Sequence, residues 1–169
     1  MTGLIKESTA KVIGWLSVII FAALVLDVLW GVVTRYVLGN QASWTEELAR
    51  FLLVWLSMLG AALAYIHNSH LGVDILTRSL DDAAVEIARL TTHVLVLCFA
   101  GGVMVYGGWN LFVERWDSGQ VLPALQISKA WFYLSIPVSG TLISVFALDS
   151  TINSLLGRGG TKRTADPEP

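Results

Sequence analysis

Four long apolar stretches constrain this chain more than any other feature of its sequence. They cover about residues 12–33, 44–66, 88–113 and 130–148, and more polar segments separate them. A bilayer core is crossed by roughly 20 apolar residues in a helix, so each stretch is long enough to span a membrane. Of the 169 residues, 54% are hydrophobic and only 14% are charged, a composition typical of membrane proteins. The sequence therefore predicts an all-α membrane protein with four transmembrane helices in a single domain, residues 1–155.

The distribution of positive charge predicts how these helices are oriented. On the side of the two tails and the middle connection, the Lys and Arg residues are Lys6, Lys11, Arg78, Arg89, Arg158, Lys162 and Arg163. On the opposite side they are Arg35, Arg50, Arg115 and Lys129. Because cytoplasmic segments of membrane proteins carry the excess of Lys and Arg, both termini are predicted to be cytoplasmic. Residues 35–50 and 114–129 then face outward, which in a bacterium is the periplasm.

Two segments outside the spans also have predicted conformations. Apolar residues recur at near-helical spacing between the second and third spans, over residues 67–87. We expect a short amphipathic helix there, lying on the cytoplasmic surface. Residues 156–169 are rich in Gly, Pro and charge, so a disordered cytoplasmic tail is expected.

Several functional classes find no support in the residues present. A net charge of −2 and the lack of a long basic cluster argue against nucleic-acid binding. His67 and His70 are three residues apart, but only Asp74 accompanies them, so no metal site is predicted. A haem-bearing electron-transfer subunit needs pairs of axial ligands in its spans; these spans offer one histidine, His93, which is more typical of a hydrogen-bonded buried residue. No catalytic or cofactor-binding set can be assembled, and no enzyme activity is predicted.

Small residues recur along two of the predicted spans. In the second span they are Ser57, Gly60, Ala61 and Ala64. In the third they are Ala100, Gly101, Gly102, Gly107 and Gly108. Small residues let helix backbones approach closely in a membrane, where lipid offers no hydrophobic driving force for association. These faces are predicted either to pack within this chain or to contact a second membrane protein, and both can hold for different faces.

The segment from Arg35 to Arg50 is the one dense group of charged and aromatic residues at a predicted membrane boundary. Its candidate partner-contact residues are Arg35, Tyr36, Trp44, Glu46, Glu47 and Arg50. Ser43 and Glu46 have the spacing of a capping box. Both glutamates lie in the first helical turn, three or four residues before Arg50, so an intrahelical ion pair is expected. Two interpretations stay open: the segment anchors the second helix, or its remaining charges, chiefly Arg35, contact a partner.

The outward connection from Glu114 to Lys129 is unusually apolar for a loop. Its apolar residues include Trp116, Val121, Leu122, Leu125 and Ile127. Exposed apolar patches of this kind usually mark interaction sites. We expect this connection, Trp116 included, either to fold back on the chain or to contact a partner.

Asp27 is the one acidic residue well inside a predicted span. A charge at that depth costs at least ~2.5 kcal/mol on insertion scales, so Asp27 should face protein or water. No second acid lies at membrane depth, and a polar contact with a neighbouring helix or with headgroups is favoured. The alternative is a stand-alone small transporter that uses Asp27 as its proton site.

Together these features resemble the small membrane subunit, the DctQ-like family, of tripartite ATP-independent periplasmic (TRAP) transporters. The resembling residues begin with Arg35-Tyr36-Val37, Trp44-Thr45-Glu46-Glu47-x-Ala49-Arg50, Trp55 and Gly60-Ala61-Ala62. They continue with His70-x-x-Val73-Asp74 and with Leu125-x-Ile127-x-Lys129-Ala130-Trp131 to Pro137. The resemblance covers roughly Lys11 to Leu155. The family pattern has proline where Ser128 stands, and a serine can cap the fourth helix instead.

The resemblance implies a non-catalytic subunit of a secondary transporter in the bacterial inner membrane. In that family a large multi-span subunit moves the solute with sodium, and a soluble periplasmic protein delivers the solute. The small subunit widens and braces the scaffold, and typical solutes are organic acids such as dicarboxylates or sialic acids. The expected partners are therefore the large subunit, the solute-binding protein and the lipid bilayer, and no cofactor is implied.

Overall fold

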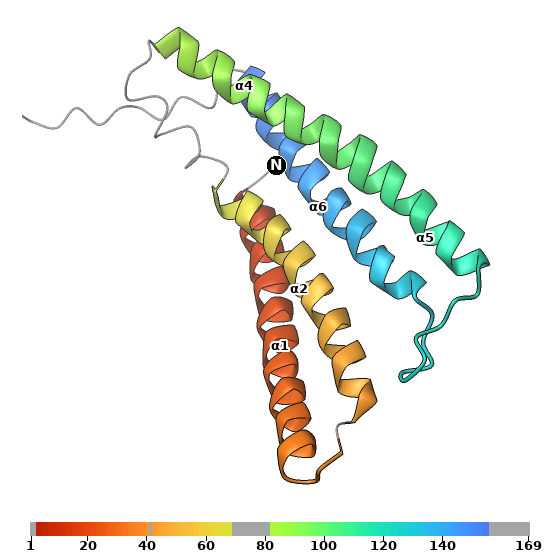
Figure 1. Cartoon of the computed structure of the whole chain (residues 1–169). Coiled ribbons are helices and arrows are strands. Elements are labelled where there is room, and N and C mark those ends of the chain that lie inside the picture. Colours follow the sequence, from red (N-terminus) through yellow and green to blue (C-terminus); the bar gives the residue numbers. More distant parts are fainter. Residues whose placement is uncertain (1–2, 41, 69–81, 156–169) are drawn as a thin grey trace, which may run out of the picture.

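The computed structural model, drawn in Figure 1, describes residues 3–40, 42–68 and 82–155. Its elements are α1 (Gly3–Tyr36), α2 (Ser43–Asn68), α4 (Asp82–Cys98), the π-helix η2 (Phe99–Gly107), α5 (Gly108–Asp117) and α6 (Ala130–Leu155). Within these residues, four helical stretches are long and apolar enough to cross a membrane: Lys6–Tyr36, Ser43–His67, Leu90–Asp117 and Ala130–Ile152. The predicted all-α class with four spans is confirmed.

The third span is part of one continuous helical run from Asp82 to Asp117, in which the nine-residue segment η2 joins α4 to α5. The predicted surface helix falls largely on residues 69–81, which lie outside the described residues. Its last residues, from Asp82 onward, belong to α4. The predicted tail, residues 156–169, also lies outside the described residues.

The spans form a row rather than a closed bundle. α2 packs between α1 and α6, and α6 packs between α2 and the long helix formed by α4, η2 and α5 (Figure 1). Large apolar side chains stay exposed along the row, including Trp15 at 70% and Leu26 at 68%. A row of this kind presents broad apolar surfaces that must meet lipid or another membrane protein.

α1 contacts α2 through a single stripe of residues. Its buried members are Ala10, Ile13, Asp27, Gly31 and Thr34. Together with the half-buried Ser17, Ile20 and Leu24, they recur at the three- and four-residue spacing of a coiled-coil seam. The two helices approach closely near the end of α1, because a Cβ at Gly31 would lie only 3.2 Å from the Oγ1 of Thr45.

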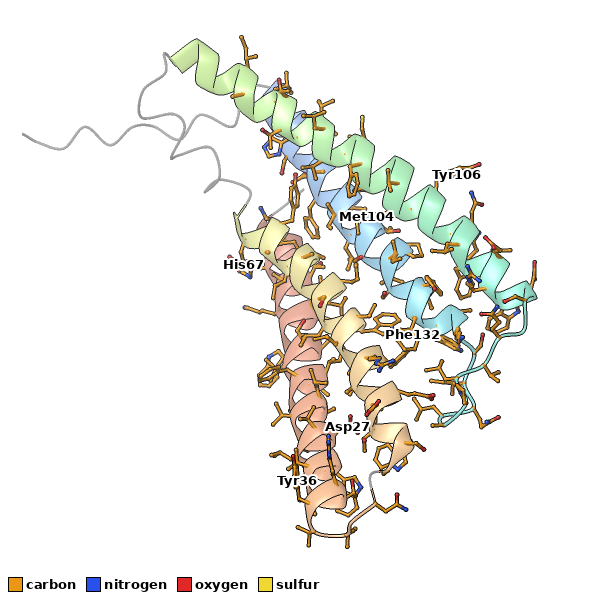
Figure 2. All side chains as sticks on the ribbon, in the orientation of Figure 1. Asp27, Tyr36, His67, Met104, Tyr106 and Phe132 are labelled. Atoms are coloured by element: carbon orange, nitrogen blue, oxygen red, sulfur yellow. The ribbon has the colours of Figure 1, made fainter. Side chains whose placement is uncertain are left out.

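Glycines bring α6 and the third span into backbone contact. A Cβ at Gly140 would lie 2.5 Å from the Cβ of Met104, whose side chain is labelled between the two helices in Figure 2. A Cβ at Gly108 would lie 2.9 Å from Ile136 Cγ2. Both glycines are buried, as is Ala100. Some of the small residues of the third span thus pack within the chain, which is one of the two interpretations drawn from the sequence.

The end of the row that holds residues 37–40 and 118–129, called the loop end below, closes both helical hairpins. Each hairpin turns through a glycine with a left-handed backbone, Gly39 with a φ of +71° and Gly119 with a φ of +62°. Glycine adopts this conformation without the steric cost that a Cβ would bring. The two turns place the start of α2 and the start of α6 at the same end of the molecule.

Candidate interaction surfaces

The described residues contain no group of three His, Cys, Asp or Glu side chains that could hold a metal ion. An open groove of about 610 Å³ lies between α1 and α2, and Lys11 is the one charged residue in its lining. The other lining residues are Gly14, Trp15, Ser17, Val18, Phe21, Leu56 and Leu63. A lining of this composition suits hydrocarbon better than an organic acid.

α2 leaves one of its faces uncovered along most of its length. The exposed residues of this face include Glu46, Arg50, Leu53, Ser57, Ala61 and Ala64, which recur every three or four residues. A Cβ at Gly60 would meet nothing within 4 Å. We call Ser57, Gly60, Ala61 and Ala64 the small-residue face of α2. No helix in the described part of the chain covers this face, in contrast to Ala100 and Gly108 of the third span, which are buried.

Glu47 is bound to the connection between α5 and α6 rather than to its own helix. Its Oε2 accepts hydrogen bonds from the backbone N–H groups of Ala124 and Leu125, both at 3.0 Å. Hydrogen bonds to an ionised carboxylate are roughly twice as strong as those between neutral groups. Of the two glutamates that could form the expected intrahelical ion pair with Arg50, Glu47 is thus bound to the turn, which offers its carboxylate two donors at once.

The connection folds as a compact turn over residues 120–129. Val121 forms an isolated antiparallel bridge across it. The Leu122 N–H donates to the Ile127 carbonyl at 2.8 Å, and the Gln126 N–H donates to the Leu122 carbonyl at 2.9 Å. Leu122 is 6% exposed, whereas Val121 and Ile127 are 47% and 36% exposed. The apolar connection thus folds back on the chain in part and keeps two apolar side chains at its surface.

Three residues on successive turns of α2 hold this connection and the start of α6. Glu47, Phe51 and Trp55 are four residues apart and share one face of the helix. The Phe51 ring packs edge-on against Phe132, with ring centroids 5.1 Å apart, and Phe132 is labelled between the two helices in Figure 2. The Trp55 Nε1–H donates to the Trp131 carbonyl at 3.2 Å. The connection is therefore fixed to α2 as well as to α5 and α6.

The rest of the charged segment lies at the surface of α2. The Arg50 Nη2 lies 3.7 Å from the Glu46 Oε2, with both side chains exposed, so the predicted ion pair is confirmed for Glu46. Ser43 is the first residue of α2 rather than the residue before it, so it does not stand at the N-cap position that the predicted capping box requires. The Thr45 hydroxyl donates to the Ala42 carbonyl at 2.7 Å. Exposed ion pairs stabilise a protein by at most about 1 kcal/mol, so the Glu46–Arg50 pair adds little to folding.

The other candidate residues of the loop end lie on two separate surfaces. Arg35 and Tyr36 are exposed at the end of α1, with the Arg35 guanidinium 5.7 Å from the Tyr36 ring centroid. Trp44 is 39% exposed at the start of α2. Trp116 is 55% exposed on α5 and packs against Phe112 in a tilted arrangement, with ring centroids 5.9 Å apart. Because α1 and α5 lie at opposite ends of the row, the structure does not bring Arg35 and Trp116 together.

Asp27 and His93 are the two polar residues that the sequence analysis singled out inside the spans. Asp27 is 6% exposed in the α1–α2 seam, and neither of its carboxylate oxygens has a hydrogen-bond partner among the described residues. The polar contact expected for Asp27 is thus not formed by the described part of the chain. His93 is also buried, and its Nδ1 lies 3.1 Å from the Tyr65 hydroxyl oxygen, as expected for a hydrogen-bonded histidine.

An open row of membrane-spanning helices with uncovered apolar faces defines a multi-pass membrane protein. The family is shown by sequence comparison: the family model for the DctQ component of tripartite ATP-independent periplasmic transporters matches residues 24–157. The chain belongs to this family. The resemblance drawn from the sequence motifs is confirmed.

Individual relatives agree with this assignment. The chain is 30% identical over 142 residues to the sialic acid TRAP transporter small permease protein SiaQ of Vibrio cholerae, covering 82% of this chain and 78% of that protein. It is 27% identical over 147 residues to a putative TRAP transporter small permease protein of Haemophilus influenzae, covering 86% and 88%. It is also 27% identical over 147 residues to the sialic acid TRAP transporter permease protein SiaT of Haemophilus influenzae, covering 85% of this chain and only 23% of that protein.

Proposed function

We propose that this chain is a non-catalytic small membrane subunit that braces the large transport subunit of a TRAP-type transporter in the bacterial inner membrane. The exposed small-residue face of α2 carries the proposal. Helices pack closely in a membrane through such residues, and no helix in the described part of the chain occupies this face. The SiaT relative supports the partnership, because the segment that matches this chain is less than a quarter of that longer permease.

On this proposal the large subunit, and not this chain, moves the solute with sodium. The solute is an organic acid that a periplasmic solute-binding protein delivers. The loop end faces the periplasm and both termini are cytoplasmic, in agreement with the distribution of Lys and Arg. The docking surface for the binding protein then includes the 120–129 turn and the residues Arg35, Tyr36 and Trp44. Trp116 lies on the separate surface of α5, and Glu46 and Arg50 form an exposed ion pair with each other.

Charge reversal at Arg35 tests the docking role. Arg35→Glu should lower uptake at sub-saturating binding protein by roughly fivefold, because a reversed surface charge weakens encounter between complementary partners by about 1 kcal/mol. Uptake by reconstituted complexes measures the effect. Lys11→Gln, at the other end of the same helix, is the control and should leave uptake unchanged. Equal uptake by Arg35→Glu at equal protein levels would remove Arg35 from the docking surface.

Asp27 supports the one competing function, a stand-alone proton-coupled transporter, since its carboxylate is buried without a partner among the described residues. Asp27→Asn separates the two functions because asparagine keeps the size of the side chain and cannot carry a proton on and off. The bracing role predicts uptake within about twofold of wild type, a change below ~0.5 kcal/mol. Abolished transport by Asp27→Asn, together with uptake by the chain alone in liposomes, would establish the competing function.

A further inference from the structure

We propose that Glu47 is a positioning residue whose carboxylate holds the 120–129 turn in the conformation that docks the solute-binding protein. The inference rests on the proposed function, in which the loop end faces the periplasm. The sequence suggested that Glu47 contacts a partner directly. Here Glu47 instead supports the docking surface from within the chain, through its hydrogen bonds to the turn.

The backbone of the turn shows why an acceptor from α2 is needed. The turn closes through hydrogen bonds between Leu122 and residues 126–127. Ala124 and Leu125 lie inside this closed segment, and their N–H groups instead meet the same Glu47 oxygen at 3.0 Å. A part-buried N–H that loses its acceptor costs more than the hydrogen bond contributed. Glu47 therefore fixes the turn at Ala124 and Leu125, whose N–H groups take no part in the hydrogen bonds that close the turn.

The surface of the turn indicates what it contacts. Val121 and Ile127 expose an apolar pair, and the other exposed residues of the turn are Pro123 and the polar Gln120, Gln126 and Lys129. The side chain of Leu122 is buried, and its N–H donates to the Ile127 carbonyl at 2.8 Å, so Leu122 anchors the turn. A small apolar patch ringed by hydrogen-bonding groups fits a soluble protein partner. Holding the turn rigid removes the ordering cost that a flexible loop would add to binding.

Glu46 provides a matched control on the adjacent position. It carries the same charge in the same helical turn, but its carboxylate faces Arg50 at the surface at 3.7 Å. Glu47→Ala and Glu46→Ala thus remove the same group from the loop end. Glu47→Ala removes the acceptor of the two hydrogen bonds from the turn, whereas Glu46→Ala removes the surface ion pair with Arg50.

The test uses the complete transport complex in lipid nanodiscs or liposomes and the solute-binding protein of the same transport system. Hydrogen exchange measured on peptides covering residues 120–129 reports the Ala124 and Leu125 amides. Uptake measured against binding-protein concentration separates the half-saturating concentration from the maximal rate. Glu47→Ala should accelerate exchange and raise the half-saturating concentration at least about tenfold, with the maximal rate within about twofold. Glu46→Ala should change neither amide exchange nor the half-saturating concentration by more than about twofold.

The outcomes separate this inference from the proposed function. If uptake by the wild-type complex does not depend on the binding protein, the docking role itself fails. If wild-type uptake saturates but Glu47→Ala leaves the half-saturating concentration unchanged, or lowers only the maximal rate, the positioning role is overturned. Should Glu47→Ala fail to accumulate, Glu47→Gln keeps the side-chain size and is subjected to the same measurements, with the same direction expected.

Discussion

Replacing Gly140 by alanine should destabilise the folded chain by about 3 kcal/mol or more, although it adds only one methyl group. The added Cβ would lie 2.5 Å from Met104 Cβ and 3.2 Å from backbone atoms of Met104 and Val105. No side-chain rotation can relieve contacts with a Cβ and with backbone, so α6 and the third span would have to separate. Thermal unfolding of the purified chain in detergent measures the effect, and the midpoint should fall by roughly 10 °C.

Gly102→Ala is the control for this substitution. Gly102 lies in the third span like Met104, but a Cβ there would have nothing within 4 Å. Alanine is favoured over glycine inside a helix by roughly 0.5–1 kcal/mol, so this variant should be as stable as wild type or more so. Equal midpoints for Gly140→Ala and wild type would mean that α6 and the third span do not meet as described.

Replacing Gly60 by leucine should leave the chain folded and abolish its assembly with the large subunit. Nothing in the described structure lies within 4 Å of a Cβ at this position, so the isolated chain has room for the larger side chain. A partner helix packed against the small-residue face of α2 has no such room, because small residues are what permits its close approach. Co-purification of the large subunit with tagged Gly60→Leu measures assembly, and the midpoint of unfolding of the chain alone measures folding.

The matched control is Gly102→Leu, an equally open glycine on another span. It should fold and should assemble with the large subunit, since the proposal places the contact on α2. Loss of assembly by Gly102→Leu with normal assembly by Gly60→Leu would move the partner surface from α2 to the third span.

The spans and the family could be predicted from sequence because both rest on local information. Runs of about 20 apolar residues define a membrane helix without reference to the rest of the chain. The order of the helices in the row could not be read in this way. The small residues of the second and third spans are alike in type, yet Gly108 is buried against α6 and the Cβ position of Gly60 is open.

The role of Glu47 is a second feature that could not be predicted from the sequence. Its position three residues before Arg50 makes it, like Glu46, a candidate for the expected ion pair, because i and i+3 residues meet on a helix. Its observed partners lie 77 and 78 residues away, and their backbone N–H groups leave no signature in a single sequence. The same holds for Asp27. An acidic residue inside a span can be recognised in the sequence, but its position in the α1–α2 seam depends on how the helices pack.

Co-purification from native membranes tests the central claim most directly. A tagged wild-type chain extracted in mild detergent should bring down a large multi-span permease subunit at one copy each, and mass spectrometry identifies that subunit. A chain that purifies alone from the same membranes, and that moves solute by itself after reconstitution into liposomes, would contradict the bracing role.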